Sequence, residues 1–218
     1  MTDAPRPPRQ RICLLGGGAL ARQLVTWAAD TPDLRVVGAL DDRRAVGAEV
    51  SAGVPVLGGL REAEGLHADG AFDACLFAIG YRHLGFKRAR YGELRGRIPF
   101  ATLVHPTAFV GPGADIGEGC VLFPHAIVDQ GARLLPDTLV NVGACVSHDC
   151  TVGPHAFLAP RAVLSGFVTV GACCFVGANA TLVDGIAVAE GVTLGAGAVA
   201  VADLPAAGTY VGVPARRL

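Results

Sequence analysis

The stretch VNVGACVSHDCTV, residues 140–152, places an aliphatic residue at every sixth position. The same spacing runs from Val104 to Leu194 and gives sixteen aliphatic residues without a break. Four positions after each of them comes a second uncharged residue that is usually small, such as Ala144 or Cys150. A fixed period of this length indicates a structural repeat, and a repeat outranks any local motif in deciding a fold.

The period itself predicts strands rather than helices. Side chains alternate between the two faces of a strand, so residues an even number of positions apart point to the same side. Six is not a multiple of the 3.6 residues of a helical turn, so a helix would spread the aliphatic stripe around its surface. Six residues form a short strand and a corner, and three such faces close a triangular coil. Residues 103–198 therefore hold about five coils of a parallel β-helix.

Composition and charge exclude several classes of function. The 218 residues carry a formal net charge of −1, with a sequence pI of about 6.6, so no basic field favours nucleic acid as a partner. No apolar run reaches the roughly 18 to 20 residues that a membrane span requires. Residues 1–10 are polar and proline-rich without the hydrophobic segment of a signal peptide, so we expect a cytoplasmic protein.

The seven cysteines show neither a disulfide framework nor zinc-ligand spacing. Cys120, Cys150 and Cys174 occupy the small inward position of the repeat, where a thiol acts as a compact apolar group. We therefore expect reduced cysteines and no metal site.

The region before the repeat alternates strands with helices. The pattern predicts strands over residues 11–15, 34–40 and 71–79, and helices over residues 19–29 and 86–95. Such alternation is typical of a small parallel sheet covered by helices. The sequence thus predicts a Rossmann-like α/β domain over residues 11–100, followed by an all-β domain over residues 101–218 that includes a C-terminal tail.

A glycine turn in the first domain matches the looser dinucleotide-binding pattern G-x-G-x-x-A, with an acidic pair about twenty residues further on. Ligands bind at the carboxyl ends of parallel strands, where helix N-termini supply amide donors. A tight strand-to-helix turn without a ligand remains the alternative. The residues that the pattern predicts for substrate binding are Gly16, Gly17, Gly18, Asp41, Asp42 and Gly80.

The chain ends in Gly212-Val-Pro-Ala-Arg216, and this motif, together with the two predicted domains, resembles a known family over residues 12–218. The family is the NeuD/PglD-like sugar acyltransferases, hexapeptide-repeat enzymes related to those of the bacillosamine and sialic-acid pathways. The resemblance implies a left-handed parallel β-helix, although crossovers between parallel strands are otherwise almost always right-handed. It also implies acetyl-CoA as co-substrate, a nucleotide-linked amino sugar held by the first domain, and a homotrimer with active sites between subunits.

The segment from Asn141 to Cys150 is similar to the catalytic segment of that family. The resemblance assigns His148 as general base, Asp149 as the partner that raises its basicity, and Asn141 as a polar residue lining the same site. The family commonly carries Glu where this chain has Asp149.

Repeat arithmetic adds a residue to this site. Position 166 lies 18 residues, or one coil, beyond His148 and is a glycine, whose amide no side chain obstructs. By similarity, Gly166 would donate to the oxyanion of the thioester. Above it we place Ala178 and Ala196, which match positions where the family lays the pantetheine of acetyl-CoA.

Other polar residues receive structural interpretations. His125 and His155 occupy the same corner position as Asp149 and are expected to face outward. A basic cluster after Gly80 is interpreted as a solvated helix face; it consists of Arg82, His83, Lys87, Arg88 and Arg90.

The sequence therefore favours an acetyl-CoA-dependent N-acetyltransferase acting on a nucleotide-linked amino sugar. Two alternatives stay open, which are O-acetylation of a sugar or sialic-acid-like hydroxyl and a non-catalytic trimeric scaffold. The nucleotide, the sugar and the length of the acyl chain also stay open.

Overall fold

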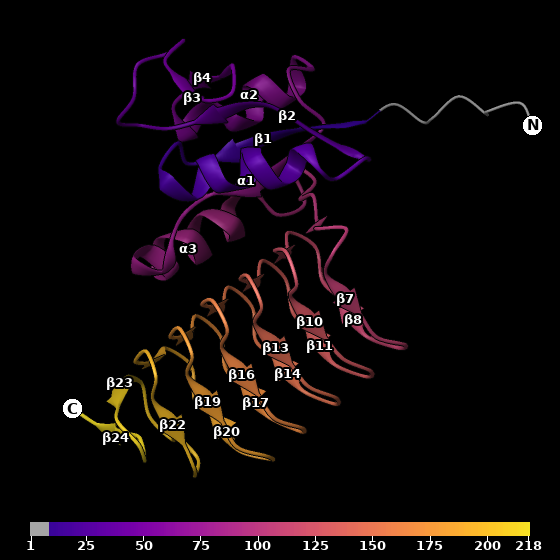
Figure 1. Cartoon of the computed structure of the whole chain (residues 1–218). Coiled ribbons are helices and arrows are strands. Elements are labelled where there is room, and N and C mark those ends of the chain that lie inside the picture. The colour runs from indigo at the N-terminus through magenta and orange to yellow at the C-terminus, as the bar shows by residue number, and fades with distance from the viewer. Residues whose placement is uncertain (1–8) are drawn as a thin grey trace, which may run out of the picture. The chain divides into compact units, whose positions relative to one another are not determined.

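The computed structural model describes residues 9–218 and divides into two compact units (Figure 1). The first unit comprises residues 9–79 and 94–101, and the second comprises residues 80–93 and 102–218. These units differ from the domains expected over 11–100 and 101–218, because residues 80–93 group with the repeat. Residues 1–8, on which the expectation of a start without a signal peptide depends, lie outside the described residues.

The first unit contains a five-stranded sheet in the order β3-β4-β2-β1-β5. Its strands are β1 (Gln10–Leu15), β2 (Leu34–Leu40), β3 (Glu49–Ser51), β4 (Val54–Gly58) and β5 (Ala74–Phe77). Four strands run parallel, whereas β3 pairs antiparallel with β4. The expectation of a purely parallel sheet was therefore wrong at this edge. Strand β3 has only three residues and β4 contains Pro55, so neither carries a recognisable strand pattern.

Helix α1 (Ala19–Ala29) has the predicted limits. Gly16 adopts φ = +111°, a conformation that side chains disfavour, and turns the chain out of β1. Gly18 is then the N-cap of the helix. One helix face, with Leu24 and Ala28 at its centre, is buried. Two shorter elements follow β4, namely the 3₁₀ helix η1 (Leu60–Glu62) and helix α2 (Ala63–Ala68).

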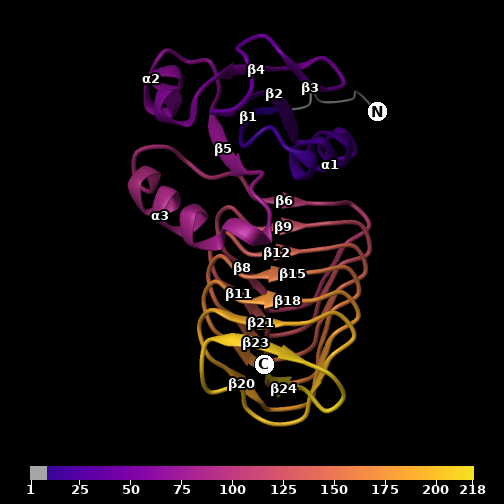
Figure 2. The same cartoon turned by 90° about the vertical axis from the view of Figure 1, so that its left-hand side faces the viewer.

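The repeat forms a left-handed parallel β-helix with three faces, as predicted (Figures 1 and 2). The β6 face consists of β6 (Leu103–Val104), β9 (Val121–Leu122), β12 (Leu139–Val140), β15 (Phe157–Leu158), β18 (Phe175–Val176), β21 (Val192–Leu194), β23 (Gly208–Val211) and β24 (Arg216–Arg217). The β7 face consists of β7 (Phe109–Val110), β10 (Ile127–Val128), β13 (Cys145–Val146), β16 (Val163–Leu164), β19 (Thr181–Leu182) and β22 (Val199–Ala200). The β8 face consists of β8 (Asp115–Ile116), β11 (Arg133–Leu134), β14 (Thr151–Val152), β17 (Thr169–Val170) and β20 (Ala187–Val188).

From β6 to β22, neighbouring strands of each face are 18 residues apart in sequence, as the pairing of Val146 with Leu164 shows. The aliphatic and small series together line one continuous core. Val110, in the first coil, is the exception, because 39% of its surface is exposed. The third residue after each aliphatic position adopts positive φ throughout residues 113–197. Glycine, Asn, Asp and His tolerate this conformation best, which explains the polar residues found at these corners.

The C-terminal tail closes one end of the β-helix. Strand β23 continues the β6 face beside β21, and β24 turns back antiparallel to β23. The side chains of Tyr210 and Ala215 complete the core at this end. The GVPAR motif therefore belongs to the cap of the repeat.

Residues 80–93 pack against the β-helix through a buried ionic cluster. They form the 3₁₀ helix η2 (Tyr81–His83) and most of helix α3 (Leu84–Leu94). Lys87 Nζ lies 3.0 Å from Asp137 Oδ1 and donates to the Asp137 carbonyl at 3.0 Å. His155 Nδ1 lies 2.7 Å from the other carboxylate oxygen, Asp137 Oδ2.

Two expectations are corrected by this cluster. His155 was expected to face outward but is only 5% exposed, and its ring lies edge-on to that of Tyr91. Lys87 was interpreted as part of a solvated face but is 3% exposed. The Asp137 carboxylate and the His155 imidazole lie at the same corner of the β-helix, in two successive coils, and α3 covers them.

Among the described residues, no helix is long and apolar enough to cross a bilayer.

Candidate active site

Three residues that stand one above another at the corner after the β7 face form what we call the histidine column: His148, Gly166 and Asp184. Each follows a core residue by two positions, and the strands that contain these core residues pair in register. A methyl group placed on Gly166 would lie 2.6 Å from His148 Cε1 and 2.7 Å from its Nε2. The prediction that Gly166 stands directly beside the histidine is therefore confirmed.

The two ring nitrogens of His148 have different surroundings. Nδ1 lies 3.0 Å from Asp149 Oδ2, in a pair whose side chains are 43% and 48% exposed. Donation from Nδ1 to that carboxylate places the proton on Nδ1 and leaves the Nε2 lone pair free. Nε2 packs closely against Gly166, because a methyl group on that glycine would lie only 2.7 Å from it. The Phe167 ring contacts the imidazole edge to face, with ring centroids 5.0 Å apart, and holds its orientation.

The backbone amide of Gly166, a buried residue, differs from the amides on either side of it. Its neighbours are used within the β-helix, because Ser165 N donates to Leu182 O and Phe167 N donates to His148 O. Within residues 9–218, no acceptor takes the Gly166 N–H. A free amide beside a histidine nitrogen is the arrangement that stabilises an oxyanion during acyl transfer.

Asn141 stands at a different corner of the same coil. It follows β12, whereas His148 follows β13, so the β7 face separates the two corners. The Asn141 side chain is 9% exposed, and its Oδ1 accepts a hydrogen bond from Val142 N at 2.7 Å. A single chain thus gives no contact between Asn141 and His148.

Ala178 and Ala196 also stand at the corner that follows the β6 face, not above Gly166 as expected. The residue above Gly166 is Asp184, whose Oδ1 would lie 2.9 Å from a methyl group on that glycine. Ala178 and Ala196 instead form what we call the small-residue column, in which Gly197 N donates to Ala178 O. The error arose because the two alanines do not differ from 166 by a multiple of 18. Ala178 is half-buried and Ala196 is exposed.

In the first unit, the glycine turn and Asp41 form one hydrogen-bonded structure. Asp41 Oδ2 accepts from Gly17 N at 2.7 Å, and Oδ1 accepts from Arg43 N at 2.8 Å. The predicted residues Gly16, Gly17 and Asp41 are therefore brought together, but the carboxylate is bonded to the turn itself. Its direct role in this structure is to fix the turn.

Asp42 and Gly80 have other local roles. Asp42 Oδ1 accepts from Leu60 N at 2.8 Å, at the start of η1. Gly80 belongs to the second unit, where it is the N-cap of η2. Sequence reasoning missed Arg44, whose guanidinium donates to Gly17 O at 2.9 Å and also to Glu49 O. Only its position two residues after the acidic pair could have drawn attention to it.

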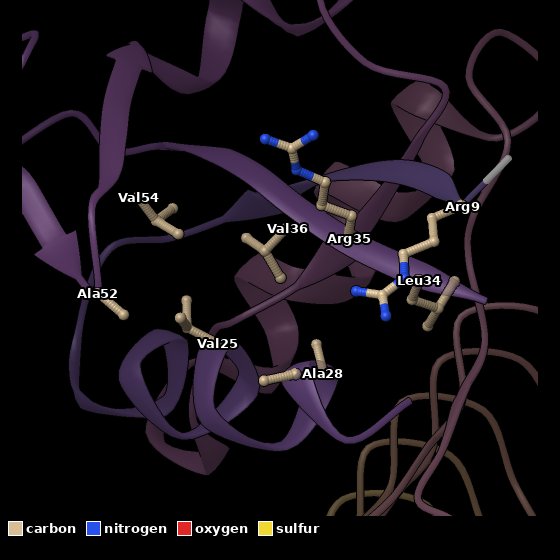
Figure 3. A pocket seen from close by; sticks show the side chains of 9 residues that line it. Arg9, Val25, Ala28, Leu34, Arg35, Val36, Ala52 and Val54 are labelled. Atoms are coloured by element: carbon tan, nitrogen blue, oxygen red, sulfur yellow. The ribbon is translucent and has the colours of Figure 1, made fainter. Parts of the chain in front are cut away.

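The first unit also contains a hollow of about 220 Å³ that includes none of the predicted residues (Figure 3). Helix α1, strand β2 and the turn before β4 line it with Val25, Ala28, Ala29, Leu34, Val36, Ala52 and Val54, and with two arginines, Arg9 and Arg35. The hollow holds no group that could act in acyl transfer.

The buried thiols behave as apolar core groups. Burial raises the pKa of both Cys150 and Cys174 to about 11, so these thiols are neutral at physiological pH. Cys150 Sγ donates to Ser165 O at 2.9 Å. Among the described residues, no group of three or more His, Cys, Asp or Glu side chains is placed to hold a metal ion.

No protein-family model matches the sequence. Carnitine operon protein CaiE from Escherichia coli O7:K1 is 33% identical over 113 residues, which are 46% of this chain and 56% of CaiE. The chain thus spans little more than half the length of this curated relative.

Several solved structures match almost the whole chain. The acetyltransferase domain of PglB from Neisseria gonorrhoeae is 30% identical with a TM-score of 0.86, over 96% of this chain and 100% of that one. The same domain in complex with acetyl coenzyme A gives a TM-score of 0.88. PerB from Caulobacter crescentus, in complex with CoA and GDP-perosamine, is 28% identical with a TM-score of 0.85, over 95% of this chain and 96% of that one.

Proposed function

This chain belongs to the hexapeptide-repeat family of sugar acyltransferases, and from that premise we propose that it transfers an acetyl group from acetyl-CoA to the amino group of a nucleotide-linked amino sugar. The observation that carries the proposal is the position of His148, with Nδ1 on Asp149 and Nε2 facing Gly166. The acetyl-CoA bound to the PglB domain and the GDP-perosamine bound to PerB support the same classes of donor and acceptor.

Each residue of the site takes one part of the reaction. The neutral acceptor amine attacks the thioester carbon, and His148 Nε2 accepts the proton that the nitrogen loses as the C–N bond forms. Asp149 keeps the proton on Nδ1 and stabilises the imidazolium that forms. The Gly166 N–H donates to the oxygen that becomes negative in the tetrahedral intermediate. The imidazolium then returns a proton to the departing CoA thiolate.

The separation of the two corners supports a homotrimer. The outward residues of the β7 face include Phe109, Ile127 and Val163, and none of the outward residues of its strands is charged. The β8 face carries Asp115 and Arg133 instead. Three copies packed with their β7 faces around a threefold axis would place the histidine column of one chain beside the small-residue column and Asn141 of the next. We propose that the pantetheine of acetyl-CoA lies between these columns.

The first unit is proposed to hold the nucleotide of the acceptor. The support is the exposed Gly18 at the start of α1, together with the turn that Asp41 and Arg44 fix through Gly17. Amide groups at a helix N-terminus favour phosphate. Gly16 and Asp42 stay predicted members of this nucleotide site. Gly80, in the second unit, stays a predicted substrate-binding residue, and a cytoplasmic location likewise stays a prediction.

A direct test incubates the protein with acetyl-CoA and a panel of UDP-, GDP- and dTDP-linked 3- and 4-amino sugars, beginning with GDP-perosamine. We expect one panel member to gain the mass of one acetyl group while CoA thiol is released in equal amount. Binding of acetyl-CoA without transfer to any amino sugar would contradict amine acetylation, and transfer to a hydroxyl sugar would then establish the O-acetyl alternative. Failure to bind acetyl-CoA would contradict enzymatic function altogether and favour a scaffold. A monomeric mass in solution would contradict the trimer.

A further inference from the structure

Asp184 stands directly beyond Gly166 in the histidine column and has no assigned role. Leu164 pairs with Leu182, so the corners that contain Gly166 and Asp184 are stacked in register. Gly185 N donates to Gly166 O at 2.9 Å, which fixes the upper corner on the lower one. The Asp184 side chain is thereby placed one coil above the glycine and two coils above His148.

Because Gly166 has no side chain, the groups above and below it close in over its Cα, and Gly166 is buried. A methyl group there would lie 2.7 Å from His148 Nε2 and 2.9 Å from Asp184 Oδ1. The two atoms are therefore no further apart than the sum of these distances. The residues from 9 to 218 nevertheless include no ion pair or hydrogen bond between them. Two acceptors at that separation lie within hydrogen-bonding reach of one ligand nitrogen.

The chemistry around this position is asymmetric. Asp149 already pairs with Nδ1, and the Phe167 ring covers one side of the imidazole. The Asp184 carboxylate is exposed, and no donor in the described part of the chain is bonded to it. A carboxylate in this state binds a cation much more strongly than a neutral hydroxyl, because hydrogen bonds between charged groups are the strong ones.

We propose that Asp184 binds the acceptor amine in its ammonium form and so selects an amino sugar over a hydroxyl sugar. The inference depends on the proposed function, because it assigns a residue to the acceptor of that reaction. Asp184 holds the nitrogen next to His148 Nε2, where the proton has to be removed. It would decide between N- and O-acetylation, which the sequence left open.

The reaction balances in atoms and charge. The ammonium gives one proton to His148 Nε2, and the resulting amine forms the new C–N bond with the thioester carbon. The C–S bond breaks, the nitrogen loses a second proton, and the CoA thiolate takes up one proton. One acetamide, one CoA thiol and one free proton result from each ammonium and acetyl-CoA. Asp184 remains ionised throughout and keeps its contact until the positive charge on the nitrogen is lost.

Asp184→Asn tests the proposal, because it removes the charge and preserves the size of the side chain. We expect the KM for the amino sugar to rise about tenfold to a hundredfold, as loss of a charged hydrogen bond does, with little change in the KM for acetyl-CoA. The Ki of the matching nucleotide sugar with a hydroxyl in place of the amine should stay within about twofold of the wild-type value. Asp115→Asn is the matched control, because that exposed aspartate lies on the β8 face and pairs only loosely with Arg133, at 3.8 Å.

The outcomes separate this inference from the proposed function. A wild-type enzyme that acetylates no amino sugar contradicts the proposed function itself. If the wild type is active and Asp184→Asn keeps the wild-type KM for the amino sugar, Asp184 does not bind the amine. An equal rise in the KM for the amino sugar and in the Ki of its hydroxyl analogue would also overturn the inference. Asp184 would then affect only the shape of the binding site and would not recognise the amine.

Discussion

The β-helix contains two histidine–aspartate pairs, and their surroundings differ in almost every respect. His148 and Asp149 are neighbours in sequence, lie 3.0 Å apart and are 43% and 48% exposed. His155 and Asp137 stand one coil apart, lie 2.7 Å from each other and have side chains that are 6% and 2% exposed. The first pair leaves the ring nitrogen Nε2 unpaired beside Gly166, whereas helix α3 covers the second.

The difference shows that the environment, not the pair of residue types, separates a reactive histidine from a structural one. The Lys87 ammonium forms an ion pair with the Asp137 carboxylate, and the Tyr91 ring packs against His155. These two side chains of α3 cover the second pair and keep substrate away from it. Removing one member of a buried ionic cluster leaves the remaining charge without compensation in a place from which water is excluded. The exposed pair has no such constraint, because water solvates whatever remains. The two pairs should therefore respond to substitution in opposite ways.

The largest expected effect on stability is that of Asp137→Asn. This change keeps the size of the side chain and suits the positive φ of 62°, but it removes the negative charge that lies 3.0 Å from the buried Lys87 ammonium. The free energy of unfolding should fall by about 3 kcal/mol. Such a loss lowers the midpoint of thermal unfolding by roughly 10 °C in a chain of this size.

Asp149→Asn is the matched control, because Asp149 also has a positive φ, of 57°. Its midpoint, measured by circular dichroism, should stay within about 2 °C of the wild type. Equal destabilisation by the two substitutions would contradict the difference between the pairs.

Gly166→Ala should impair activity while leaving the fold intact. The new methyl group would lie 2.6 Å from His148 Cε1, so the half-exposed ring has to shift away from it. Displacement of a general base by about 1 Å costs roughly a hundredfold in turnover. The control is Gly92→Ala in α3, where a methyl group meets nothing within 4 Å. Wild-type turnover by the Gly166 variant would show that the histidine is not the base.

The smallest expected effect is that of Asp149→Asn on turnover. An amide can still contact Nδ1, but it no longer stabilises the imidazolium, so kcat should fall by about tenfold. The KM values for both substrates should change little, since Asp149 faces away from Nε2. A loss as large as that caused by removing His148 would mean that the carboxylate takes part in the proton transfer itself.

The sequence predicted the β-helix and the pairing of His148 with Gly166 because both depend only on a period of six. The same arithmetic, taken one coil further, reaches Asp184, which was overlooked. Ala178 and Ala196 were assigned to the wrong corner, although counting by 18 separates them from Gly166.

The buried cluster could not be found in this way. Lys87 is brought to Asp137 by the packing of α3 on the β-helix, and the local sequence contains no signal for that contact. Strands β3 and β4 were missed for a different reason, because three residues and a proline give no usable alternation.

The most direct test of the account compares His148→Ala with His155→Ala in the same buffers, by transfer of acetyl from acetyl-CoA to the amino sugar and by thermal unfolding. We expect the kcat of His148→Ala to fall about a thousandfold, while its midpoint of thermal unfolding stays that of the wild type. We expect His155→Ala to unfold at a clearly lower temperature than the wild type and to keep most of the wild-type kcat while it is folded. Near-normal turnover by the His148 variant, or loss of turnover by a fully folded His155 variant, would contradict the account.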